Sequence, residues 1–71
     1  MPLIEVKLLE DVFTPLQKQE LICRLTDAVV AVQGEKLRGV TWVLVQDVPT
    51  GQWGIGGDAV TTEAVHAMVG R

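Results

Sequence analysis

The 71-residue sequence has few residues that could crosslink a small domain, since it holds one cysteine, Cys23, and one histidine, His66. A single cysteine excludes an internal disulfide, and one cysteine with one histidine excludes an ordinary zinc site with several protein ligands. Nothing beside either residue argues for an activated nucleophile. We therefore expect no metal site, and we expect Cys23 to be a packing residue and His66 a surface or tail residue.

Positive charge is also scarce, because six lysines and arginines face nine carboxylates and give a net charge of −3. Such a balance lacks the basic footprint of a nucleic-acid-binding protein. No apolar run approaches the roughly 18 residues of a membrane span, and no basic segment precedes an apolar one at the start. With a lone cysteine, these absences favour a cytoplasmic protein with neither nucleic acid nor membrane as partner.

Apolar residues are abundant, at 48% of the chain, which indicates a globular protein. The length of 71 residues allows one domain, over residues 1–71. A chain this short has a poor ratio of buried volume to surface and usually needs disulfides, a metal or partner subunits. Because the first two are excluded, we expect an obligate oligomer.

Residues 2–9 alternate between apolar and charged side chains, which predicts a strand with one buried face. A helix is predicted to follow, with Thr14 as N-cap, Pro15 in the first helical position and Gln17 completing a capping box. Gly34 suits the left-handed position that ends a helix.

The predicted helix has two apolar stripes. The wider one faces a sheet and consists of Leu21, Ile22, Leu25, Ala28, Val29 and Val32. Leu16, Cys23 and Val30 recur every seven residues on the opposite side. They are either ordinary exposed apolar residues, a subunit contact, or a surface covered by the C-terminal tail.

Residues 35–39 are predicted to be a connection, and the nearly continuous apolar run 40–48 suits a strand buried on both faces. Strand, helix and strand then form a βαβ unit with a right-handed crossover. Four glycines in the segment PTGQWGIGG, residues 49–57, indicate a tight turn or hairpin that holds Trp53. The remaining tail predicts a short helix.

Pro2 follows the initiator methionine directly. Removal of Met1 would leave a secondary amine, and α-amino groups titrate near pH 8, closer to neutrality than other common amines. Desolvation by apolar neighbours such as Leu3 and Ile4 would lower that pKa further, which suits a general base. The alternative is a proline that is merely tolerated at a strand end.

These pieces together resemble the 4-oxalocrotonate tautomerase family of the tautomerase superfamily. The resemblance rests on Pro2, the first strand PLIEVKLLE, the helix opening TPLQKQELI, and the segment GQWGIGG at residues 51–57. It implies an α/β, sandwich-like fold in which a βαβ unit ends in a hairpin. It also implies that two chains pair into a four-stranded sheet with two helices, and that three dimers form a homohexamer. The implied chemistry is cofactor-free, with Pro2 as the base and Trp53 and Ile55 in the pocket wall.

Two arginines of the family's diacid tautomerases are missing. Val12 or Phe13 stands at the first position and Trp42 or Thr41 at the second, so a dicarboxylate is disfavoured as substrate. Trp42 either packs against the sheet or is a second pocket aromatic beside Trp53. The cations left nearby are Lys7, Lys36 and Arg38. Arg38 lies in the loop before the second strand, and it is either a solvated loop charge or a substrate-binding residue that reaches a neighbouring subunit's pocket.

The resulting expectation is an isomerase in which Pro2 transfers a proton in keto–enol or dienol-to-enone tautomerisation of a small 2-oxo or 2-hydroxy unsaturated acid. Two alternatives stay open. The same fold can serve a hydratase, decarboxylase or dehalogenase, in which Pro2 acts as an acid, or it can be a non-catalytic oligomeric binding module.

Overall fold

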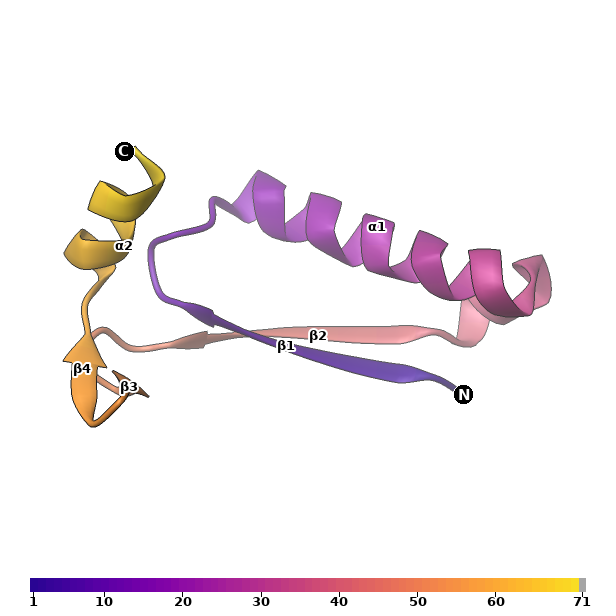
Figure 1. Ribbon diagram of the computed structural model, residues 1–71. Coiled ribbons are helices and arrows are strands. Elements are labelled where there is room, and N and C mark those ends of the chain that lie inside the picture. The colour runs from indigo at the N-terminus through magenta and orange to yellow at the C-terminus, as the bar shows by residue number, and fades with distance from the viewer. Residues whose placement is uncertain (71) are drawn as a thin grey trace.

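The computed structural model describes residues 1–70 and has two layers (Figure 1). Strands β1 (Leu3–Leu9) and β2 (Trp42–Val48) pair in parallel, and helix α1 (Pro15–Gln33) runs along one face of them. A hairpin of β3 (Trp53–Ile55) and β4 (Asp58–Val60) and helix α2 (Thr62–Val69) lie beyond one end of these strands. The predicted βαβ unit with a hairpin and a tail helix is therefore confirmed.

Helix α1 begins as predicted. The Thr14 side chain accepts a hydrogen bond from the Gln17 backbone N–H at 3.1 Å, and the Gln17 side chain accepts one from the Thr14 N–H at 2.9 Å. The expected left-handed end is wrong in detail. Gly34 has the expected positive φ of +104°, but its ψ of 160° lies outside the left-handed helical region, and a second helical segment follows it.

That segment corrects the expected connection. Residues Glu35–Val40 form a 3-10 helix, η1, so β2 begins at Trp42 and not at Val40. The expectation that this strand is buried on both faces is also wrong for a single chain. Val43 and Val45 are half-buried under α1, whereas Trp42 and Leu44 point away from it and are 56% and 41% exposed.

The register explains this difference between the two faces. Leu3 pairs with Trp42, Glu5 with Leu44 and Lys7 with Gln46, so these six side chains share the face that α1 leaves uncovered. We call this the open face. On the opposite face, α1 is tied to β2 by an ion pair between Lys18 and Asp47, whose Nζ–Oδ2 distance is 2.6 Å.

The hairpin and α2 are attached to the loop after β1. Gly56 and Gly57 form the turn with φ +61° and +91°, which is the backbone that a two-residue hairpin requires. The buried Thr62 hydroxyl donates to the Glu10 carbonyl at 2.8 Å, and His66 Nε2 lies 2.6 Å from the Asp11 carbonyl. His66, predicted to be a surface or tail residue, is thus a half-buried residue of the tail helix.

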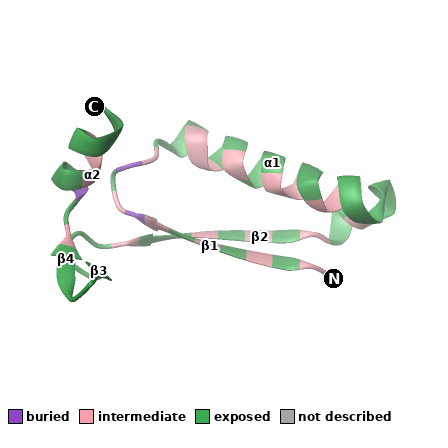
Figure 2. Ribbon diagram, viewed as in Figure 1, coloured by how far each residue is buried: buried purple, intermediate pink, exposed green. Residues whose placement is uncertain are grey.

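Burial is concentrated where these segments meet. Figure 2 shows buried backbone only near the end of β1, in the following loop and at the start of α2, and the buried residues are Leu9, Val12 and Thr62. A hydrophobic content of 48% with so little burial leaves much apolar surface for a partner. No helix in residues 1–70 is long and apolar enough to cross a membrane.

The second stripe on α1 stays mostly uncovered. Leu16 is 76% exposed, Cys23 is exposed and Val30 is half-buried. Coverage by the described part of the C-terminal tail is therefore wrong, and so is packing of Cys23 within the chain, because α2 lies against the loop after β1. A subunit contact and ordinary exposure remain as the two alternatives.

Candidate active site

Pro2 lies at the head of β1. It is half-buried, and its carbonyl accepts a hydrogen bond from the Trp42 backbone N–H at 3.0 Å. This bond fixes the start of β1 beside the start of β2. The ring nitrogen is joined to Met1 by a peptide bond in the full chain, so it becomes basic only when that bond is cut.

Trp42 and Arg38 belong to the same end of the sheet. Trp42 opens β2 on the open face, and Arg38 lies in η1 just before it. The Arg38 guanidinium is already engaged by its own chain, with Nε 2.7 Å from Glu35 Oε1 and Nη1 2.9 Å from Asp27 Oδ1. These hydrogen bonds raise the pKa of Arg38 above its ordinary value, and the bond to Glu35 contributes more than the bond to Asp27. A substrate carboxylate would have to displace these partners.

Trp53 and Ile55 line a cleft at the opposite end. Its volume is about 290 Å³, and it lies where β1, the loop after it, the hairpin and α2 meet. Its lining is almost entirely apolar and consists of Lys7, Leu8, Leu9, Val12, Phe13, Trp53, Ile55, Val60, Val65 and Met68. Such a cleft has the character of a small-molecule site, an apolar wall with one charged group.

The predicted site residues therefore form two groups within one chain. Pro2, Trp42 and Arg38 lie where the parallel strands begin, and Trp53 and Ile55 lie beyond where they end. Seven residues of strand separate the two ends by about 20 Å. A single chain does not bring Pro2 to the Trp53 cleft.

Lys7 lines this cleft, although the sequence favoured Arg38 among the nearby cations as the substrate-binding residue. Its alternation with Val6 and Leu8 places Lys7 on the face away from α1. The strand register then pairs it with Gln46, and it lines the same depressions as Trp53. No spacing in the sequence would have revealed that neighbourhood.

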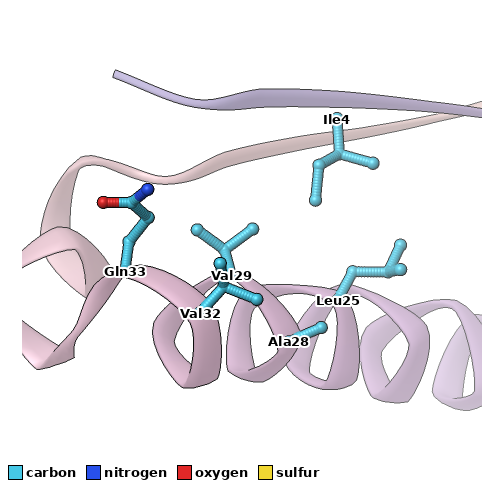
Figure 3. Close-up of a pocket in the computed structure, with 6 residues that line it drawn as sticks. All are labelled: Ile4, Leu25, Ala28, Val29, Val32 and Gln33. Carbon is cyan, nitrogen blue, oxygen red and sulfur yellow. The ribbon is translucent and has the colours of Figure 1, made fainter.

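A second apolar groove lies between α1 and β1 near the Pro2 end. In Figure 3, Ile4 points from β1 toward Leu25 and Val29 of α1. The groove is about 340 Å³ in volume, and Ala28, Val32 and Gln33 complete its lining. Within the described residues, the sheet of β1 and β2 has only these two strands, so one edge of β1 beside this groove is unpaired.

Comparison with known proteins decides the family. The model of the family described as tautomerase enzyme matches residues 2–63, a segment that begins at Pro2 and includes the whole hairpin. The chain belongs to the 4-oxalocrotonate tautomerase family. Membership supports an isomerase of the tautomerase type as its general activity.

Individual relatives agree with this assignment. The chain is 38% identical to "Probable tautomerase K2" of Dickeya dadantii over 67 residues, which cover 94% of this chain and 98% of that protein. Among solved structures, the 4-oxalocrotonate tautomerase isozymes of Methylibium petroleiphilum are 33% identical with a TM-score of 0.73, covering 90% and 97% of the two chains. TomN, a 4-oxalocrotonate tautomerase homologue of the tomaymycin biosynthetic pathway, is 31% identical with a TM-score of 0.77, covering 94% and 95%.

Proposed function

We propose that this tautomerase, after removal of Met1, uses the secondary amine of Pro2 as a general base on a small 2-hydroxy or 2-oxo unsaturated acid. The amine takes the proton of the 2-hydroxyl group while the C2 carbonyl forms. The resulting ammonium returns a proton to a carbon of the conjugated system, so substrate and product are isomers and the amine is restored. The observation that supports this most is the family match that begins at Pro2, at the head of β1.

The local environment suits a base. A free α-amino group has a pKa near 8, and removal of water from around it disfavours the charged form and lowers that pKa. Pro2 is followed by Leu3 and Ile4 and is half-buried in the single chain. Covering of this end by a second chain would complete the desolvation.

The position of the cleft argues for a site shared between chains. Because about 20 Å separates the two ends of the sheet, the Pro2 of one chain would meet the Trp53 and Ile55 of another. Trp53 and Ile55 would provide an apolar wall that excludes water from the proton transfer. The site would then be complete only in an oligomer.

The exposed apolar surfaces support such an assembly. Val32, in the groove between α1 and β1, is 81% exposed, and Leu3, Trp42 and Leu44 on the open face are each more than 40% exposed. The free edge of β1 and this groove would pair with a second copy, giving a four-stranded sheet. The open face would then join dimers into a hexamer.

Mass and turnover of the processed protein test the proposal. Intact mass should show a chain lighter by one methionine, and that chain should convert phenylpyruvate enol or 2-hydroxymuconate. Reaction with 3-bromopropiolate, followed by peptide mapping, should modify Pro2. An unmodified Pro2 together with no turnover of either substrate would favour the non-catalytic binding module.

A further inference from the structure

Lys7 is a charged residue in an otherwise apolar cleft. Its side chain lines the Trp53 cleft and also the adjoining depression formed with Gln52 and Trp53. The ammonium donates to the Gln46 side-chain oxygen at 2.5 Å, from the neighbouring position on β2. Lys7 and Trp53 thus form adjacent parts of one wall.

The charge of Lys7 is not neutralised by a carboxylate. Among residues 1–70, the ammonium forms no ion pair, and no Asp or Glu lines either of the two depressions. Three other cations are each held by at least one carboxylate, in the pairs Lys18–Asp47, Arg24–Glu20 and Arg38–Glu35. Gln46 holds the Lys7 ammonium in place but leaves its charge available to an anion.

Lys7 cannot act on the Pro2 of its own chain. The two residues are five positions apart on one strand, about 17 Å, and an odd separation places them on opposite faces. Lys7 therefore belongs with Trp53 and Ile55, in the wall that one chain would present to another chain's Pro2.

We propose that Lys7 binds the carboxylate of the substrate and that the substrate is a monocarboxylate with an apolar substituent. The claim that this acid is turned over rests on the proposed function. The claim that Lys7 binds its carboxylate does not. One cation matches one carboxylate, and the apolar remainder of the cleft accommodates a hydrocarbon group and gives no partner to a second carboxylate. Lys7 thus takes over part of the role of the two absent arginines from a different position in the fold.

Binding and turnover by the processed, full-length protein test this role. The probes are cinnamate, an apolar unsaturated monocarboxylate, and cinnamyl alcohol, which has the same hydrocarbon without the charge. Lys7→Gln should weaken cinnamate binding, measured by calorimetry, about tenfold or more and leave cinnamyl alcohol binding unchanged. Lys7→Arg should retain cinnamate binding, and Gln46→Glu should weaken it by giving the ammonium a carboxylate partner.

Arg24→Gln is the matched control, because it removes the same charge from an exposed site on α1. With phenylpyruvate enol, Lys7→Gln should raise KM with kcat largely retained, and the wild type should prefer this substrate to 2-hydroxymuconate. Equal cinnamate affinity in Lys7→Gln and Arg24→Gln would overturn the inference, as would a larger rise in KM for Arg38→Gln than for Lys7→Gln.

The Pro2→Ala variant separates the two proposals. If the proposed function is right, this variant loses turnover but still binds cinnamate in a way that depends on Lys7. If Pro2→Ala keeps full turnover, the proposed role of the ring-held secondary amine is wrong while Lys7-dependent binding still supports the role of Lys7.

Discussion

The backbone N–H of Trp42 donates a 3.0 Å hydrogen bond to the carbonyl of Pro2 and so joins the head of β1 to the first residue of β2. The acceptor is the backbone carbonyl of Pro2 and not its ring. Any residue at that position would therefore keep this hydrogen bond. The position of this end of the sheet therefore does not depend on proline, although the proposed chemistry does.

Pro2→Ala is accordingly expected to lower activity without unfolding the protein, because removal of Met1 then leaves a primary amine that no ring orients. Complete loss of a positioned general base costs about a hundredfold or more in rate, and the unoriented primary amine should recover only part of that loss. Circular dichroism and the oligomeric mass of the variant should match those of the wild type, while kcat for phenylpyruvate enol should fall. Equal kcat in both proteins would contradict the general-base role.

Two impaired variants should restore each other if the site is shared between chains. Pro2→Ala lacks the ring-held secondary amine and Trp53→Ala lacks the cleft wall, so each assembly alone should be impaired. Unfolding the two together and refolding them at equal ratio creates sites with an intact Pro2 from one chain and an intact Trp53 from another. Turnover should then exceed the average of the two parents.

Native mass spectrometry provides the control for that mixture. Mixed assemblies that form but show no gain over the parents would argue against a shared site. Refolding each variant alone under the same conditions accounts for losses during the procedure.

The groove between α1 and β1 is expected to be a subunit contact. Val32 lines it and is 81% exposed, so Val32→Asp removes little burial from the single chain. A carboxylate there would be buried without a partner in an assembled sheet, which is strongly unfavourable. Sedimentation should show a smaller particle than the wild type, and turnover should fall with it.

Gln19→Asp is the matched control, since it adds the same charge to an exposed position of α1. An unchanged mass for Val32→Asp would mean that this groove is not an interface.

Thr62→Val should destabilise the protein, because the buried hydroxyl is the donor that ties α2 to the Glu10 carbonyl at 2.8 Å. Loss of this hydrogen bond without a change in shape costs about 1–2 kcal/mol in the free energy of unfolding. Thr26→Val is the comparison, because the Thr26 hydroxyl bonds to Ile22 within the exposed helix. Denaturant titrations at one protein concentration should give the larger loss for Thr62→Val, and equal losses would contradict the assigned role.

Local features of the fold were predictable because they depend on neighbouring residues. Thr14, Pro15 and Gln17 specify the start of α1 by themselves, and Gly56 and Gly57 supply the positive φ angles of the hairpin. The place of Pro2 after Met1 made it a candidate base, and the resemblance carried by the segment at residues 51–57 was needed to favour that role over a proline tolerated at a strand end.

The composition of the cleft was not predictable because it depends on register and on chain crossing. Periodicity puts Lys7 opposite Val6 and Leu8, but it does not say that Gln46 is its partner or that the hairpin folds back to place Trp53 beside it. Nor does it show that Trp42 and Trp53, eleven positions apart, belong to opposite ends of the sheet. The apolar character of run 40–48 indicated burial on both faces, which a single chain does not provide.

The protonation state of Pro2 tests the central claim most directly. Nitrogen-15 NMR of the processed protein, labelled at proline, follows the titration of the Pro2 amine with pH. Desolvation should place its pKa near or below 8, so that the amine is a base at neutral pH. A pKa well above 8 would contradict the general-base mechanism and favour the protonated proline of a hydratase, decarboxylase or dehalogenase.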